Sequence, residues 1–162
     1  MENERKTDRS ADMGMDEHRL SDILLASQIK ATDIYETPPQ IIWIDNSTIA
    51  TLGNFSASTG KAKSKKTFNV SALVAASLAG KQVLNYRAHL PEGKQRILYV
   101  DTEQSRFHCR SVLERILRLA GLPTTTDPEN LDFFCLREYS PSVRIEVIDY
   151  ALRQNKGYGL VI

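Results

Sequence analysis

A glycine followed by four lysines within seven residues is the segment best suited to binding an anion. Residues Gly60 to Thr67 read GKAKSKKT and fit the pattern G-x-x-x-x-G-K-[ST] at every fixed position except the sixth. In such a loop, backbone N–H groups point at phosphate oxygens, the lysine reaches the outer phosphates, and the hydroxyl helps to hold Mg²⁺. The pattern predicts that the segment binds ATP and that Thr67 also contacts the metal. The predicted nucleotide-binding residues are Gly60, Lys61, Ala62, Lys63, Ser64, Lys65, Lys66 and Thr67.

Lys65 is the departure from this pattern, and it leaves two interpretations open. Glycine normally takes the sixth position because the turn there needs a backbone conformation that residues with a Cβ avoid. The segment could instead be a solvated basic loop or a nucleic-acid patch that happens to follow a glycine. An Ala-rich apolar segment begins directly at Thr67 and an acidic strand end follows later, so the context favours the phosphate loop.

Two carboxylates follow an apolar run at residues 96–101, RILYVD. Such a run predicts a central parallel strand buried on both faces. Asp101 and Glu103 therefore fall at the carboxyl end of a strand, where α/β sheets bind ligands. We expect Glu103 to be the catalytic carboxylate that polarises a water, and Asp101 to orient that water or touch Mg²⁺ through water. The alternative is that these carboxylates only cap the next helix.

The elements that must position these residues alternate along the chain. Apolar spacing and turn residues predict an antiparallel hairpin before the loop and a long polar connection over residues 81–95. The predicted helices cover residues 20–29, 67–79, 104–120 and a segment from 140 that ends by Gly157, and the later strands cover residues 96–101, 131–136 and 158–162. This alternation predicts an α/β protein with a mostly parallel sheet.

Composition and charge exclude several classes of protein. The 162 residues contain 21 Lys and Arg against 20 Asp and Glu, which excludes a uniformly basic nucleic-acid coat and a wholly acidic disordered chain. The longest run of small apolar residues, Ser71 to Gly80, is about half the ~20 residues that a membrane span needs. The N-terminus also lacks the apolar centre of a signal peptide, so the sequence predicts a cytoplasmic protein.

The two cysteines, Cys109 and Cys135, are 26 positions apart and form no CxxC pair. No histidines cluster near them in the sequence, so neither a disulfide scaffold nor a zinc site is expected. We expect both to be reduced, half-buried residues that fill space in the core.

Taken together, the motifs resemble the RecA-like P-loop ATPases of the RepA and DnaB replicative-helicase branch. The resemblance rests on GKAKSKKT, on ILYVDTEQS starting 30 residues after Thr67, on FFCLREYSP and on GYGLVI, and it covers roughly residues 38–162. It is nearest to the bacterial plasmid and mobile-element ATPases of that branch, known as mobilisation, excision or RepA-like proteins. It implies a RecA-like fold, ATP and Mg²⁺ binding, ATP hydrolysis, homo-oligomeric and hexameric rings, and action on DNA. By resemblance, Lys66 contacts the phosphates, Thr67 the metal, and Glu103 is catalytic.

The expected organisation is a disordered leader over residues 1–21, a short helix and linker over 22–37, and the ATPase domain over 38–162. In the family, the Walker B aspartate ends the strand that GYGLVI begins. The chain stops before that position, so the resemblance implies the N-terminal portion of a larger ATPase. Two other functions stay open: a basic nucleic-acid-binding module without hydrolysis, and an ATPase that binds nucleotide with little or no activity.

Overall fold

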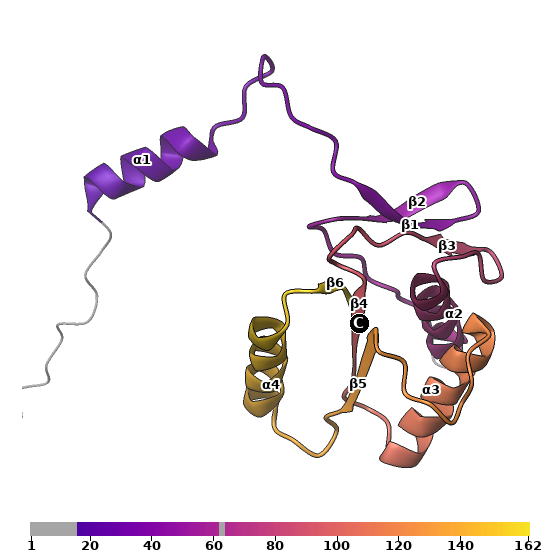
Figure 1. Ribbon diagram of the computed structural model, residues 1–162. Coiled ribbons are helices and arrows are strands. Elements are labelled where there is room, and N and C mark those ends of the chain that lie inside the picture. Colours follow the sequence, from indigo (N-terminus) through magenta and orange to yellow (C-terminus); the bar gives the residue numbers. More distant parts are fainter. Residues whose placement is uncertain (1–15, 62–63) are drawn as a thin grey trace, which may run out of the picture. The chain divides into compact units, whose positions relative to one another are not determined.

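The computed structural model describes residues 16–61 and 64–162, and the chain divides into two compact units, Met1–Thr37 and Pro38–Ile162 (Figure 1). The first unit contains helix α1 (Glu17–Ser27), none of whose residues is buried. The helix begins three residues before the predicted Leu20 because the Asp16 carboxylate accepts a hydrogen bond from the His18 N–H and caps it. Residues 1–15 of the predicted leader lie outside the described residues.

An antiparallel sheet opens the second unit, with strand order β2-β1-β3. Strands β1 (Gln40–Ile44) and β2 (Ser47–Thr51) form the predicted hairpin, and β1 also pairs with β3 (Tyr86–Ala88). The prediction of an unbroken polar connection over residues 81–95 is therefore wrong. Tyr86 and Ala88 are buried on either side of the exposed Arg87, an alternation too short to stand out among polar neighbours.

A parallel sheet of order β5-β4-β6 forms the rest of the unit. Its central strand β4 (Arg96–Asp101) has the predicted bounds, and β5 (Leu131–Cys135) and β6 (Tyr158–Val161) pair with it in parallel. Figure 1 shows helix α4 (Pro141–Gln154) on one face of this sheet and helices α2 (Lys66–Ala79) and α3 (Arg106–Ala120) on the other. The α/β prediction is confirmed at this level: the second unit contains a parallel three-stranded sheet flanked by helices.

The strand before the lysine-rich loop belongs to the predicted antiparallel hairpin and not to the parallel sheet. That strand is β2, which pairs antiparallel with β1. It ends at Thr51, nine residues before Gly60, so the loop does not follow a strand of the parallel sheet directly. The cause is the short turn at Asp45 and Asn46, which folds the two strands back on each other.

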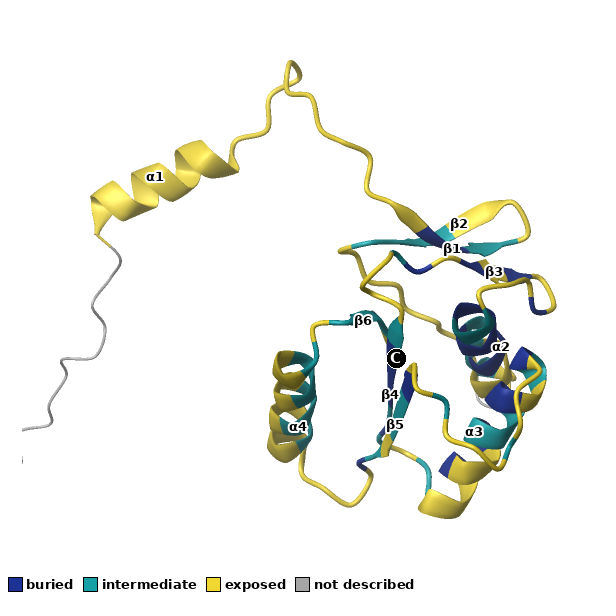
Figure 2. Cartoon of the chain, viewed as in Figure 1, coloured by how far each residue is buried: buried dark blue, intermediate teal, exposed yellow. Residues whose placement is uncertain are grey.

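Helix α2 (Lys66–Ala79) packs against both sheets. The prediction of an Ala-rich helix over residues 67–79 is confirmed to within one residue. The helix contacts β3, β4 and helix α3 (Arg106–Ala120), and Figure 2 shows buried residues along it. Small side chains allow this close approach because they leave little volume between the backbones. Gly80 is the C-cap of the helix and has the left-handed conformation that favours glycine there. The buried residues of α2 are Ser71, Ala72, Val74, Ala75, Ala76 and Ser77.

At the amino end of the parallel sheet, a polar network joins the three strands. The Asp132 carboxylate accepts hydrogen bonds from the Arg96 guanidinium at 2.8 Å and from the Tyr158 hydroxyl at 2.6 Å. Burial alone would raise the pKa of Asp132, but the hydrogen bonds from Tyr158 and Arg96 and the Arg96 charge together lower it. The network therefore stabilises the ionised carboxylate where β4, β5 and β6 lie side by side.

Strand β6 carries a glycine at an irregularity in its pairing with β4. Arg96 is opposite Tyr158 and Ile97 is opposite Leu160, so Gly159 is an extra residue between two pairs. A Cβ atom at position 159 would overlap the backbone carbonyl of Lys94. Only glycine allows the backbone of Lys94 to approach β6 this closely.

Candidate nucleotide site

The lysine-rich loop turns into helix α2 at Lys65. Lys65 has φ 60° and ψ 24°, which is the left-handed conformation. This is the conformation that the expected glycine would supply, and it costs a residue with a Cβ about 1–2 kcal/mol. The chain therefore keeps the turn of the phosphate-loop pattern although it lacks the glycine.

The first turn of α2 has backbone donors that no neighbouring side chain satisfies. The N–H groups of Phe68 and Asn69 both donate to the Lys65 carbonyl. Among the described residues, none accepts a hydrogen bond from the N–H of Lys66 or Thr67, and no side chain caps the helix. The first turn also has no acidic residue, so the partial positive charge of the helix start is not neutralised locally.

The Lys66 side chain folds back over the loop. Its Nζ donates to the Gly60 carbonyl at 2.7 Å, which brings the first and seventh positions of the pattern together. Gly60 is closely packed, because a Cβ there would lie 2.7 Å from the Ser64 Oγ. Thr67 and Lys61 are exposed, and Ala62 and Lys63 lie outside the described residues.

The turn after β4 uses the Asp101 carboxylate as its centre. Asp101 is buried, and its Oδ1 accepts hydrogen bonds from the N–H groups of Glu103 at 2.9 Å and Gln104 at 2.7 Å. Its Oδ2 accepts from the Gln104 Nε2 at 2.8 Å. Neither predicted carboxylate caps α3, because the N-cap residue is Ser105 and no described side chain caps the helix. Asp101 instead holds the turn that comes before the helix, by accepting from the N–H groups two and three residues further on. The role of Asp101 at a metal stays a prediction.

Glu103 is exposed on the same turn, and its carboxylate has no hydrogen-bond or ion-pair partner within residues 16–61 and 64–162. The contacts of these residues include no bond between the lysine-rich loop and this turn. The structure thus brings Gly60, Ser64 and Lys66 together as one group and Asp101, Glu103 and Gln104 as another. Helices α2 and α3, which begin at these two groups, pack against each other.

One pair of residues that was not predicted from the sequence lies beside the turn from Asp101 to Gln104, called the acidic turn below. The Sγ atoms of Cys109 and Cys135 both contact the Gln104 carbonyl oxygen, at 3.7 Å and 3.4 Å. Burial, and then the neighbouring Cys135 thiol, raise the pKa of Cys109 to about 12. The predicted strand over residues 131–136 and the predicted helix over 104–120 place both cysteines near element ends, but the pairing of β5 with β4 that brings them together is visible only in the structure.

A cavity of about 990 Å³ lies beside β6, between the β1–β2 hairpin, residues 52–58 and α2. Its lining is mostly apolar and includes Ile42, Leu52, Leu73 and Leu160. None of the described residues that the sequence predicted for the nucleotide or for catalysis lines it. The candidate site is therefore the exposed loop at the start of α2 and not this cavity.

Within the described ranges, no helix has the length and apolar character needed to cross a membrane. The same residues contain no group of three or more His, Cys, Asp or Glu side chains that could hold a metal ion. Comparison with protein-family models, with curated proteins and with solved structures finds no match to this chain.

Proposed function

We propose that the chain binds MgATP through Gly60–Thr67. The observation that carries the proposal is the left-handed turn at Lys65, which leads into the uncapped start of α2. The N–H groups of Lys66 and Thr67 have no acceptor among the described residues, and a helix start of this kind with adjacent lysines attracts phosphate groups. Lys66 already lies over the loop on the Gly60 carbonyl, which an incoming phosphate would replace as its partner.

The residues present also fit a magnesium ion beside the phosphates. Thr67 offers an exposed hydroxyl, and Mg²⁺, when bound, would neutralise charge on the outer phosphates. The Asp101 carboxylate has about four lone-pair positions, and three of these accept the described hydrogen bonds. One position is left for a water, so Asp101 fits contact with the metal through water only.

We further propose that the chain hydrolyses ATP and acts on DNA. Glu103 is an exposed carboxylate without a described partner, so it is free to accept a proton from an attacking water. A RecA-like arrangement, homo-oligomeric rings and work on plasmid or mobile-element DNA rest on the resemblance of the motifs.

A second candidate function is binding of nucleic-acid backbone phosphates without hydrolysis. It is favoured by the exposure of Lys61 and Lys65 together with the lack of described contacts between the loop and Glu103. Such binding would weaken steeply with salt because each phosphate contact releases a counterion.

The first experiment titrates the chain with a fluorescent ATP analogue, with and without Mg²⁺, and repeats the titration with Lys66→Ala. We expect the substitution to weaken binding about 10- to 100-fold, since a hydrogen bond to a charged group contributes about 1.5–3 kcal/mol. Lys81→Ala is the matched control, because Lys81 is an exposed lysine outside the loop. Equal affinities for the wild type and Lys66→Ala would contradict the phosphate-loop assignment.

The second experiment measures ATP hydrolysis with and without single-stranded DNA and compares wild type with Glu103→Gln. Stimulation by DNA that is lost in the variant supports an ATPase coupled to DNA. Strong, salt-sensitive DNA binding without nucleotide binding would support the second candidate function instead.

A further inference from the structure

Two thiols share one acceptor directly beside the acidic turn. Cys135 and Cys109 both direct their Sγ atoms to the Gln104 carbonyl, at 3.4 Å and 3.7 Å. Both cysteines are free, and Cys109 is buried while Cys135 is half-buried. Two sulfur atoms in contact with the same oxygen are neighbours in space, although 26 positions separate them in the sequence.

The two cysteines belong to different elements that meet at this point. Cys135 is the last residue of β5 and is in register with Asp101 of β4. Cys109 lies in the first turn of α3, where its N–H donates to the Ser105 carbonyl. A bond between them would tie the start of α3 to the end of β5, on either side of the turn that carries Glu103.

We infer that Cys109 and Cys135 form a reversible disulfide when the chain meets a small-molecule disulfide such as oxidised glutathione. The shared contact on Gln104 and the burial of the pair carry this inference. In a reducing compartment the pair stays as two thiols, so the disulfide is a modification and not part of the resting fold.

The exchange proceeds in two steps that balance in atoms and electrons. The thiolate of the more exposed Cys135 attacks one sulfur of the oxidant, forming a mixed disulfide and releasing one thiolate. The Cys109 sulfur then attacks Cys135 Sγ, the second oxidant thiolate leaves, and the released thiolates take up the protons of the two cysteines. The protein dithiol is oxidised by two electrons, and the oxidant is reduced to two thiols.

Oxidation would also change the acidic turn. The two S–H groups that donate to the Gln104 carbonyl would be lost, which leaves that carbonyl to find another donor. The turn from Asp101 to Gln104 would have to adjust, and Glu103 would move with it. This consequence for hydrolysis rests on the proposed function, whereas formation of the disulfide does not.

The test incubates the full chain with oxidised glutathione, then denatures it, alkylates the free thiols and measures the mass. After oxidation we expect neither cysteine of the wild type to be alkylated, and we expect the mass of the chain to fall by two hydrogen atoms with no glutathione added. After treatment with dithiothreitol, both cysteines should be alkylated again. Cys109→Ser and Cys135→Ser are the matched variants. In each, the remaining cysteine should stay alkylatable or carry one glutathione.

Two thiols that remain alkylatable in the oxidised wild type, or disulfides that form only between chains, would overturn the inference. Serine at either position is close in size to cysteine, and far-ultraviolet circular dichroism of each variant checks that it folds. If the disulfide forms in a chain that binds no nucleotide, the proposed function fails and this inference stands. If ATP is bound and hydrolysed but no disulfide forms, only this inference fails.

In a chain that hydrolyses ATP, the oxidised form should be slower by up to about 100-fold, because a misplacement of a catalytic group by about 1 Å can have an effect of this size. Dithiothreitol should restore the rate. Equal rates in both forms would overturn the link between the disulfide and the acidic turn.

Discussion

The lysine-rich loop and the acidic turn both come just before a helix of the same layer, yet they use their polar groups in opposite ways. In the loop, the first N–H groups of α2 lack described partners, and the one side-chain hydrogen bond of Lys66 among the described residues goes to the Gly60 carbonyl. In the turn, the buried Asp101 accepts three hydrogen bonds from its own neighbours. Donors at the start of the loop's helix thus have no described acceptor, whereas Asp101 satisfies the donors of its own turn. Of the two predicted carboxylates, Asp101 accepts these three bonds and Glu103 has no partner among the described residues.

The largest expected effect is that of Asp101→Ala on stability. The substitution leaves three donors in or beside a buried turn without their acceptor, so the free energy of unfolding should fall by about 3 kcal/mol. Asp101→Asn should lose about half as much, since its amide oxygen can still accept the two backbone bonds. Urea unfolding measures both. A loss for Asp101→Ala as small as that of the exposed Glu103→Ala would remove the contrast between the two regions.

Asp132, at the opposite end of the same sheet, is a second carboxylate for comparison, and its contribution to stability should depend on pH. Asp132→Asn should lower the free energy of unfolding by about 1–2 kcal/mol at neutral pH, because Arg96 and Tyr158 lose a charged acceptor. The pKa of Asp132 is lowered from 3.8, so this contribution is complete above that value and is lost as pH falls through the lowered pKa. Unfolding of wild type and variant in a series of decreasing pH should therefore converge. A difference that does not change with pH would contradict the ionised network.

A smaller effect is expected at the turn of the lysine-rich loop. Lys65→Gly should be more stable than Lys65→Ala by about 0.5–1 kcal/mol. Glycine avoids the cost of about 1–2 kcal/mol that alanine has in the left-handed conformation, but it loses more backbone entropy on folding. Both variants remove the same charge, so their difference isolates the backbone. Thermal unfolding followed by circular dichroism measures it. Equal stabilities would mean that Lys65 does not hold this conformation in solution.

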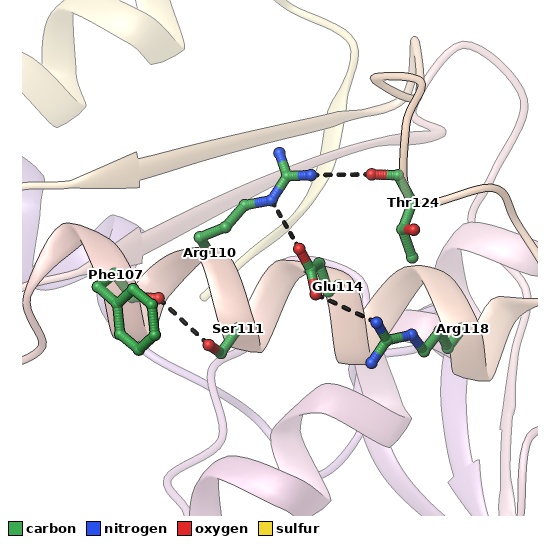
Figure 3. A network of polar contacts seen from close by, with 6 residues as sticks. All are labelled: Phe107, Arg110, Ser111, Glu114, Arg118 and Thr124. Carbon is green, nitrogen blue, oxygen red and sulfur yellow. Dashed lines mark hydrogen bonds and ion pairs between the residues drawn. The ribbon is translucent and has the colours of Figure 1, made fainter.

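The smallest effect is expected on the exposed face of α3, where Glu114 lies between two arginines (Figure 3). Its carboxylate is 3.0 Å from the Arg110 Nε and 3.2 Å from the Arg118 Nη2, and Arg110 also donates to the Thr124 carbonyl. Glu114→Ala should cost only about 0.5 kcal/mol, and less at high salt. Urea unfolding at two salt concentrations tests this. A loss of stability for Glu114→Ala close to that for Asp101→Ala would show that burial does not explain why the two carboxylates differ in their effect.

Local patterns in the sequence predicted the elements that carry the candidate site. Strand β4 was predicted with its observed bounds because a continuous apolar run is typical of a central strand. Helix α2 was predicted to within one residue, since its apolar segment ends at Gly80. The left-handed turn at Lys65 was anticipated as a requirement of the pattern, and the structure has it.

The features that the sequence did not predict depend on pairing between distant segments. The split into two sheets arises because β1 pairs with β2 and with β3, which begins 42 residues after β1 ends. No local period encodes such a pairing, and the three residues of β3 are too few to show one. The contact of Cys109 and Cys135 on Gln104 likewise depends on β5 lying next to β4.

Gly159 allows only one register of β6 against β4. If the strand slid by one residue in either direction, the side chain of Tyr158 or Leu160 would have to occupy the space beneath the Lys94 carbonyl. That space holds no Cβ atom, so both shifted alignments are excluded by volume and not by lost hydrogen bonds. The absence of a side chain at Gly159 therefore fixes the register of β6 against β4. In that register Tyr158 lies opposite Arg96 and can donate its hydrogen bond to Asp132.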